Sequence, residues 1–369
     1  MNLLWARPGR VGGSEDYFVR QLIGLGEVEH EFDLSAFVLP GFADAHPELP
    51  QRMFVGSPVS GDRRPVRVAM EHTWLARAGR RRGLALMHHG GGTVPATGVR
   101  PAVLTIHDLQ WHDYPSYVAP LKLRYLQWAT PRSIRRAAII TTPTEFVKRT
   151  VVDAYGVDPS RVVTVRHGVE PSLGHAATGE DELRAKYGLG RAPIVVYPAM
   201  THPHKRHDFL VDLVAGPWRD VVLVLTGGAG AAEDAVRARI ERLDLASRVI
   251  RTGRVPTPDR DGLIKMAVAV AFPSEYEGFG APALEAMALG APLIASDRGS
   301  LPEVVADAGL VRPLEPDAWA GALDEVIRRR AELVAAGADR VQHFSTRRSA
   351  EDLLGAYRRA LGSTGGRSS

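Results

Sequence analysis

The sequence contains no cysteine. Disulfides, thiolate metal sites and a cysteine nucleophile are therefore excluded, and the composition fits a reducing compartment such as the cytoplasm. No segment approaches the roughly 18 unbroken apolar residues of a membrane span. Residues 1–8 show neither a basic region nor a small-residue cleavage site, so we expect no export signal. These absences predict a cytoplasmic protein.

The 369 residues suit two domains of ordinary size. Short apolar runs alternate with helical patterns, which is typical of parallel sheets with crossover helices. We therefore expect an α/β fold of two Rossmann-like, doubly wound parallel-sheet domains facing a cleft. The predicted strands are Leu3–Trp5, Ser35–Leu39, Leu84–Met87, Ala102–Ile106, Ala137–Thr142, Val162–Arg166, Pro193–Pro198, Val221–Thr226, Val249–Thr252, Val268–Phe272, Pro292–Ala295 and Leu310–Arg312.

The domain boundary is expected in a turn-rich segment without periodicity. It separates a first domain, residues 1–170, from a linker, residues 171–178, and a second domain, residues 179–346. A helix over residues 347–361 is expected to cross back to the first domain. The Gly/Ser-rich residues 362–369 are predicted to be disordered.

Positive charge is concentrated in the first domain. Residues 63–149 contain 15 basic and 4 acidic residues. Such a surface suits peripheral contact with an anionic membrane, here the inner membrane face, or a phosphate-bearing acceptor, and a solvated arginine-rich surface is an equal alternative. No nucleic-acid partner is expected, because no stacking aromatic series accompanies the basic residues. Residues 120–138 could form a membrane-surface helix, but Pro131 interrupts the pattern, which favours core packing.

The most informative loop follows the strand predicted over residues 268–272. Gly278 and Gly280 permit close backbone approach, and a helix start follows them. Its free N–H groups suit an anion such as a diphosphate. Glu277 precedes these amides and Glu285 lies about one turn into the helix. Two carboxylates beside an anion site indicate neutral, hydroxyl-rich groups such as a sugar and a ribose.

Residues 273–290 read Pro-Ser-x-x-Glu-Gly-Phe-Gly-x-x-x-x-Glu-Ala-Met-Ala-x-Gly. This pattern resembles the signature of family 4 of the retaining glycosyltransferases, which have the GT-B fold. The resemblance implies transfer of a mannose- or glucose-type hexose from a nucleoside-diphosphate sugar to a glycan, lipid-linked or small-molecule acceptor. It implies no metal and no cofactor other than the nucleotide sugar, which is a co-substrate.

The family pattern also implies roles for these residues. Glu277 would contact donor-sugar hydroxyls and Glu285 the ribose. Gly278 and the amides of Phe279 and Gly280 would contact sugar or phosphate. The backbone near Val255 would meet the base.

The loop over residues 197–207 resembles the phosphate-binding loop of the family, with Lys205 as the cation that neutralises the diphosphate. Many members carry an arginine six residues before that lysine, where this chain has Ala199. Arg206, His204 or Thr201 are candidate replacements.

Three segments of the first domain complete the predicted site. Gly12 and Gly13, before a helix, resemble the glycine loop of the family, where Gly13 would reach the donor phosphates and Gly12 the acceptor side. His107 and Asp108 resemble its His-Asp motif, with His107 contacting the donor sugar and Asp108 on the acceptor side. His88 and His89, followed by three glycines, suggest a flexible acceptor-side loop. Neither H-E-x-x-H nor another zinc spacing occurs.

Two alternatives remain open at this level. A nucleotide-sugar epimerase shares the fold, and the alanine at position 199 also fits a non-catalytic, nucleotide-sugar-binding partner subunit.

Overall fold

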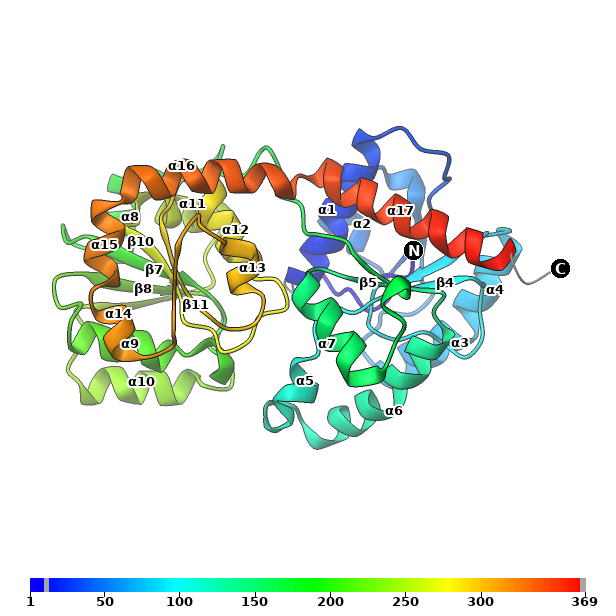
Figure 1. Cartoon of the computed structure of the whole chain (residues 1–369), viewed down its shortest axis with the longest axis horizontal. Helices are drawn as coiled ribbons and strands as arrows, with labels where there is room; N and C mark the ends of the chain where they lie inside the picture. Colours follow the sequence, from blue (N-terminus) through cyan, green and yellow to red (C-terminus); the bar gives the residue numbers. More distant parts are fainter. Residues whose placement is uncertain (10–12, 366–369) are drawn as a thin grey trace. The chain divides into compact units, whose positions relative to one another are not determined.

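The computed structural model describes residues 1–9 and 13–365, and the chain divides into two compact units (Figure 1). Unit 1 combines Met1–Gly168 with the C-terminal segment that starts at Phe344, and unit 2 is Val169–His343. The segment expected to be a linker therefore belongs to unit 2, where Lys265 Nζ donates to Gly174 O at 2.7 Å.

Unit 2 is a six-stranded parallel sheet in the order β9-β8-β7-β10-β11-β12. Relative to the chain this is 3-2-1-4-5-6, the order of dinucleotide-binding folds. Its strands are β7 (Ile194–Pro198), β8 (Val222–Thr226), β9 (Val249–Gly253), β10 (Ala269–Phe272), β11 (Leu293–Ser296) and β12 (Leu310–Arg312). Its helices are α8 (Glu180–Tyr187), η4 (Pro203–Lys205), α9 (His207–Ala215), α10 (Glu233–Arg242), α11 (Thr257–Met266), α12 (Ala281–Ala288), α13 (Leu301–Val305), α14 (Pro316–Ala320), α15 (Ala322–Arg328) and α16 (Arg330–Val341).

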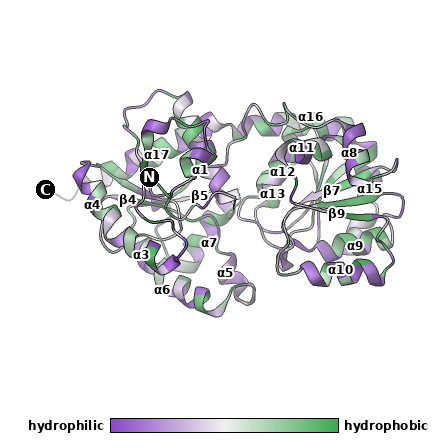
Figure 2. Ribbon diagram, turned by 180° about the vertical axis from the view of Figure 1, so that it is seen from behind, coloured by the Kyte–Doolittle hydropathy of each residue, from purple (hydrophilic) through white to green (hydrophobic). Residues whose placement is uncertain are grey.

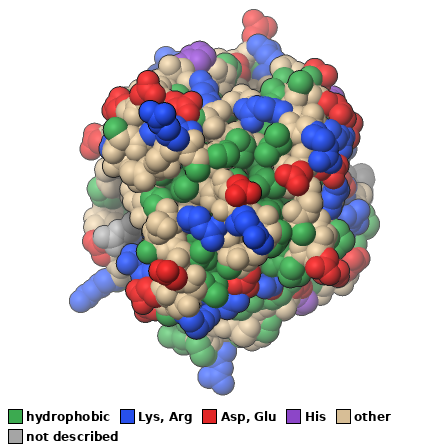
Figure 3. All heavy atoms as spheres, turned by 90° about the vertical axis from the view of Figure 1, so that its left-hand side faces the viewer, with side chains coloured by type: hydrophobic (Ala, Val, Ile, Leu, Met, Phe, Trp, Pro, Cys, Tyr) green, Lys and Arg blue, Asp and Glu red, His purple; other side chains and the backbone are tan. Residues whose placement is uncertain are grey.

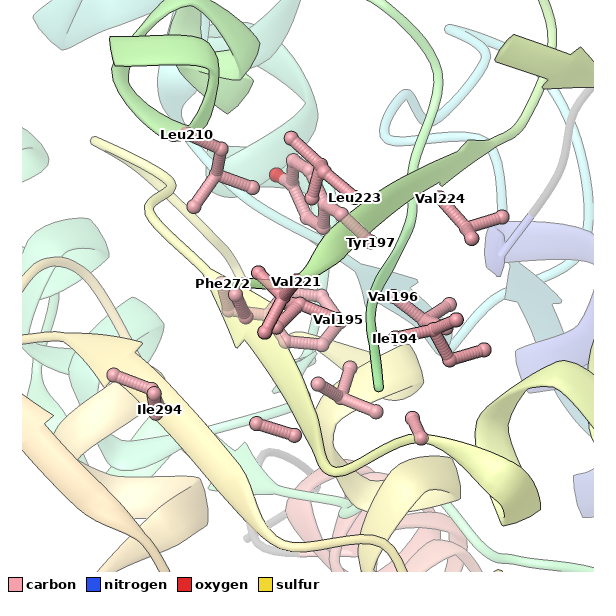
Figure 4. Packing of buried hydrophobic residues seen from close by; sticks show 14 of the residues in the cluster. Ile194, Val195, Val196, Tyr197, Leu210, Val221, Leu223, Val224, Phe272 and Ile294 are labelled. Carbon is pink, nitrogen blue, oxygen red and sulfur yellow. The ribbon is translucent and has the colours of Figure 1, made fainter. Parts of the chain in front are cut away.

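The strands of this sheet are apolar runs because helices cover both of its faces. Ile194, Val195 and Val196 in β7 are completely buried, and Phe272 of β10 packs beside them (Figure 4). Figure 2 shows the same pattern, with hydrophobic strands inside and hydrophilic helix surfaces outside. All six strands predicted for this half are present within one or two residues of their expected bounds.

Unit 1 has a four-stranded parallel sheet, β3-β4-β5-β6, and a two-stranded pair, β1-β2. The strands are β1 (Ala36–Val38), β2 (Phe54–Gly56), β3 (Met87–His89), β4 (Ala102–Thr105), β5 (Ile139–Thr142) and β6 (Val162–Thr164). The helices are α1 (Gly13–Glu27), α2 (Phe42–Ala45), η1 (Gln51–Met53), α3 (Arg64–His72), α4 (Trp74–Arg81), α5 (Gln110–Asp113), η2 (Pro115–Tyr117), α6 (Pro120–Arg136), α7 (Glu145–Tyr155) and η3 (Pro159–Arg161).

The first predicted strand, Leu3–Trp5, is wrong in extent. Only Asn2 pairs there, as an isolated parallel bridge to both Phe37 and His89, and it joins the two parts of the sheet. The chain turns at once, because Leu4 N–H donates to Asn2 Oδ1 at 3.1 Å and Ala6 N–H donates to Leu3 O at 2.9 Å. The strand β2 was not predicted, because it is only three residues long and does not belong to a longer apolar run.

The C-terminal helix α17 (Thr346–Gly365) packs on unit 1 against α1 and the strands β4 to β6. It begins one residue before the predicted helix and continues four residues beyond Leu361, so residues 362–365 are helical rather than disordered. Residues 366–369 lie outside the described part of the chain. A connecting segment, η5 (Gln342–Phe344), precedes this helix.

The prediction for the segment after residue 120 is partly wrong. Helix α6 runs through Pro131 without a break. Leu121 is 83% exposed and Trp128 55% exposed, so these two side chains do not pack in a core.

The face of unit 2 in Figure 3 carries interspersed basic and acidic side chains with apolar ones between them. Within residues 1–9 and 13–365, no helix is long and apolar enough to cross a membrane.

Helices α1 and α17 approach closely at Gly24. A Cβ atom there would lie 2.1 Å from Thr346 O and 3.2 Å from Ala350 Cβ, whereas a Cβ at Gly26 of the same helix meets nothing within 4 Å. We expect Gly24→Ala to destabilise the protein by about 1–3 kcal/mol through this overlap. The matched control Gly26→Ala should be neutral or stabilising by up to about 1 kcal/mol, through higher helix propensity. Urea unfolding measures both, and equal effects would contradict the packing.

Candidate functional site

In unit 2 the chain continues from the central strand β7 to β8 and β9 on one side, and then crosses to β10 on the other side of β7. The loops after these two neighbouring strands therefore diverge and leave room for a ligand at the carboxyl edge. Lys205 lies in the loop after β7, and Glu277 in the loop after β10. The topology thus brings together two residues that are 72 positions apart.

Lys205 and Glu277 form an ion pair, with Nζ 2.5 Å from Oε1. The Lys205 side chain is 19% exposed and that of Glu277 11% exposed. Ser274 Oγ also donates to Oε1, at 2.7 Å. Because both hydrogen bonds use Oε1, Oε2 can still accept from a hydroxyl group.

Tyr197, at the end of β7, supports this pair from below. Its hydroxyl donates to Lys205 O at 3.0 Å and lies 2.9 Å from Ser274 Oγ. Burial, reinforced by the charge of Glu277, raises the pKa of Tyr197 well above its ordinary value. The phenol therefore keeps its proton and remains a donor. Neither Tyr197 nor Ser274 was expected from the sequence to take part in the site, although both belong to the two loops that resemble the family.

The backbone of Glu277 is fixed by the loop after β11. Ser300 N–H donates to Glu277 O at 3.1 Å. A Cβ at Gly299, whose φ is 60°, would lie 2.7 Å from Glu277 N. Gly280 caps α12 in the left-handed region, at φ 86°, where a Cβ would also meet Leu301 at 2.9 Å. Glycine is thus required at both positions for conformation and for space.

The second glutamate, Glu285, is 5% exposed on α12. Its Oε2 lies 3.5 Å from Arg260 Nη1 of α11, a residue that the sequence analysis missed. Val255 is half-buried in the loop after β9. Gly278 is half-buried and Phe279 is buried in the loop before α12. The ligand contacts proposed for these four residues stay predictions.

The three residues that could replace an arginine at position 199 differ in burial, in charge and in their partners. Thr201 is fully buried and donates to Glu233 Oε2 at 2.6 Å. Burial, reinforced by the charge of Lys205, lowers the pKa of His204 to about 3, so this ring is neutral at pH 7. Arg206 is charged, but its guanidinium pairs with Glu275 at 2.9 Å and with Asp208 at 3.3 Å. The charged groups of this loop are therefore Lys205 and Arg206, and both pair with carboxylates.

A buried ion pair beneath the same loop was not predicted from the sequence. Arg251 of β9 pairs with Glu233 of α10, and Arg251 Nη2 donates to Thr201 Oγ1 at 3.1 Å. The two charged side chains are about 10% exposed. They come from different elements, so no local pattern in the sequence could pair them.

In unit 1, His107 follows β4 and is surrounded by aromatic rings. The centroid of its ring lies 5.4 Å from that of Tyr17, 5.6 Å from Phe18 and 5.8 Å from Trp5. Nε2 lies 3.1 Å from Gly90 O, and since a carbonyl only accepts, Nε2 carries the proton. Burial lowers the pKa of His107 to about 4. The ring is thus neutral at pH 7, with Nδ1 as an acceptor.

Two other predicted site residues of unit 1, Gly13 and Asp108, lie at or just before the start of a helix. Gly13 is the first residue of α1, and Gly12 lies outside the described residues. Asp108 Oδ1 accepts from Gln110 N–H at 3.1 Å and so shapes the turn before α5.

The interpretation of His88 and His89 as part of a flexible loop is wrong, because both end the buried strand β3. His88 bridges Tyr357 OH of α17 at 2.9 Å and Thr105 Oγ1 at 2.7 Å. His89 Nδ1 lies 3.2 Å from Asn2 Nδ2. These hydrogen bonds hold both rings in the interior. The His89 side chain is buried, so its burial does not support the predicted contact with an acceptor.

Among the described residues, no group of three or more His, Asp or Glu side chains is arranged to hold a metal ion.

Two family models match the chain. Residues 11–173 match the model described as Glycosyltransferase Family 4, and residues 179–340 match the model described as Glycosyl transferases group 1. The two matches cover 163 and 162 of the 369 residues.

Similar proteins are known from sequence. The O-antigen chain mannosyltransferase B of Escherichia coli is 27% identical over 281 residues, which are 74% of each chain. The D-inositol 3-phosphate glycosyltransferase of Kineococcus radiotolerans is 32% identical over 254 residues, which cover 62% of this chain but only 58% of that protein. Among solved structures, Anabaena HepE in complex with UDP-glucose aligns with a TM-score of 0.73 and 18% identity, over 96% of this chain and 98% of that one.

The pKa of His107 generates a prediction for stability. Between pH 6.5 and about 4 the unfolded chain binds a proton at His107 that the folded chain does not, so stability is lost as the pH falls through this window. His107→Gln keeps a donor for Gly90 O and removes this contribution, which is at most about 3 kcal/mol.

We therefore expect His107→Gln to lose less stability than the wild type between pH 7.5 and 4.5 in denaturant unfolding. The exposed His175, replaced by Gln, is the control. If both variants follow the wild-type curve, His107 is not held neutral by burial.

Proposed function

Because the chain belongs to family 4 of the glycosyltransferases, which have the GT-B fold, we propose that it is a retaining, metal-independent hexosyltransferase. The donor is a nucleoside-diphosphate sugar, which binds at the carboxyl edge of the unit 2 sheet. The ion pair of Lys205 and Glu277, at the point where β7 and β10 diverge, is the observation that carries the proposal.

Positive groups of the site bind the diphosphate of the donor, and carboxylates bind its hydroxyl groups. Lys205 and the start of α12 near Ala281 bind the diphosphate, since a cation and a helix N-terminus both favour negative charge. Glu277 accepts hydrogen bonds from sugar hydroxyls through Oε2 and keeps Lys205 in place through Oε1. Glu285 accepts from the ribose. In unit 1, His107 accepts from a sugar hydroxyl through Nδ1.

In the reaction the bond between the anomeric carbon and the diphosphate oxygen breaks, and a hydroxyl oxygen of the acceptor forms the new bond on the same face. The acceptor proton passes to the departing diphosphate. Lys205 stabilises the charge that develops on this leaving group, a type of contribution worth roughly 100- to 1,000-fold in rate. We assign no protein nucleophile and no resident metal or cofactor.

The sugar and the acceptor are proposed by class. A mannose- or glucose-type hexose fits one relative, which is a mannosyltransferase, and the UDP-glucose complex of HepE. The acceptor is a glycan, a lipid-linked sugar or a small molecule, in keeping with relatives named for an O-antigen chain and for inositol 3-phosphate.

The proposed function predicts the behaviour of two site variants. Lys205→Met and Glu277→Gln should each lower kcat/KM for the donor by at least about 100-fold. Activity is measured with a panel of UDP- and GDP-linked hexoses and acceptors of the three classes, in the presence of EDTA, and NMR of the product gives the anomeric configuration. We expect retention and no effect of EDTA.

The matched control is Lys186→Met, which breaks a similar pair, Lys186 Nζ to Asp259 at 2.7 Å. It should keep kcat/KM within about threefold of the wild type. Full activity of Lys205→Met, an inverted product or epimerised sugar formed without acceptor would each contradict the proposal. Donor binding without turnover across the panel would instead favour a non-catalytic subunit.

We also propose that the protein works in the cytoplasm and contacts the inner membrane face through unit 1. The support is the exposed pair Leu121 and Trp128 on α6, among Lys122, Arg124 and Arg132. Leu121→Ser/Trp128→Ser should lower co-sedimentation with phosphatidylglycerol vesicles by about tenfold, because apolar anchors and basic residues act together at anionic surfaces. Ile327→Ser, which removes an exposed apolar side chain of unit 2, is the control. Unchanged sedimentation of the α6 variant would rule out this contact.

A further inference from the structure

Unit 1 contains a cavity of about 870 Å³ that none of the proposed site residues lines. It lies where β4 and β5 begin, around Ala102 and Ile139. His107 follows the opposite end of β4, so the cavity and the predicted sugar contact are at opposite edges of the sheet. A volume of this size is typical of small-molecule binding sites.

Five arginines from separate parts of unit 1 line this cavity. They come from the segment before β4, the end of α6, the segment before β6 and the last turns of α17. The five are Arg100, Arg135, Arg136, Arg161 and Arg359. No Asp or Glu belongs to the lining, and within the described residues none of the five forms an ion pair with a carboxylate.

One of these five side chains, Arg161, stabilises the end of α6. Arg161 Nη2 donates to Ile134 O at 3.0 Å and to Ala137 O at 2.5 Å, and so binds the carbonyl groups at the end of α6. Asp158 lies beside Arg161, outside the lining, where it accepts from Ser160 N–H at 2.8 Å.

The remaining four arginines keep most of their donors. Arg100 Nη1 donates to Val99 O at 3.5 Å and its Nη2 to Pro95 O at 3.2 Å, and Arg136 Nη1 donates to Val94 O at 3.5 Å. A guanidinium has five N–H groups, so at least three remain on Arg100 and four on Arg136. Arg135 and Arg359 are exposed at the cavity rim, where an incoming molecule can reach them.

The charges in the cavity repel one another. Burial lowers the pKa of Arg100, and the positive charge of Arg136 lowers it further. An anion between these side chains would replace repulsion with attraction and form charge-assisted hydrogen bonds, for which the planar guanidinium suits phosphate.

The lining also narrows the ligand class. It contains no aromatic side chain on which a nucleobase could stack, and its apolar part consists of Pro101, three alanines and Ile139. Ser160 and Ser363 add hydroxyl groups. We propose that this cavity binds a compact, multiply charged phosphate compound, either a soluble one or the phosphomonoester headgroup of a lipid.

Titration calorimetry of the full chain with inorganic pyrophosphate tests the proposal. Arg100→Gln/Arg136→Gln, and separately Arg359→Gln on the surface of α17, should weaken binding at least tenfold. Arg81→Gln, an exposed arginine of α4 outside the cavity, is the control and should change affinity less than twofold. Each titration is repeated with Lys205→Met, so that diphosphate bound at the proposed donor site is recognised separately. Thermal unfolding checks that each variant is folded, and Arg359→Gln tests the site if the double variant is not.

Vesicles of phosphatidate in phosphatidylcholine distinguish the two sources of phosphate. If the cavity variants lose pyrophosphate but sediment with the vesicles like the wild type, the ligand is soluble; if they lose both, it is the headgroup. Unchanged pyrophosphate affinity in the cavity variants, or an equal loss in Arg81→Gln, would overturn the proposal. The arginines would then serve only the ends of α6 and α17, where cations are favourable.

Discussion

The ion pair between Lys205 and Glu277 depends on a property of the whole sheet of unit 2. Because β7 is central and its neighbours β8 and β10 lie on opposite sides, the loops after β7 and β10 part at the carboxyl edge. Tyr197 and Ser274 then join the two loops by hydrogen bonds beneath the pair. A lysine that is 19% exposed beside a carboxylate is costly to desolvate, and these bonds repay part of that cost. The two loops of the site are therefore joined by hydrogen bonds within the protein itself.

Unit 1 depends in the same way on a part of the chain that comes last in sequence. Helix α17 completes it, since Tyr357 bonds His88 in the interior and Ser349 Oγ donates to Arg166 O at 2.5 Å. Gly24 and Gly168 let the helix approach to contact distance at Thr346. Burial keeps His88 and His107 neutral, because a charged imidazole would lack water around it.

Arginine serves two different purposes in this chain. In unit 2 it pairs with carboxylates, as in Arg251 with Glu233 and Arg312 with Glu325, and these pairs fix loops and helices. In the cavity of unit 1 five arginines belong to a lining that contains no carboxylate. Arginine pairs with carboxylates in unit 1 as well, as in Arg166 with Asp352, whereas the cavity arginines form no such pair within the described residues. Composition alone, with 41 arginines, does not separate these roles.

The sequence by itself determined the α/β class, all six strands of unit 2 and the loop that carries Glu277 and Glu285, because apolar runs and glycine positions are local signals. It located the start of α17 within one residue. It misplaced the first strand and mistook His88 and His89 for loop residues, since burial at the end of a short strand leaves no periodicity. Only the tertiary structure decided the partners: Lys205 with Glu277, Arg251 with Glu233, and the five arginines of one cavity. Such pairs join residues far apart in the chain, and strand order, which no local pattern encodes, brings them together.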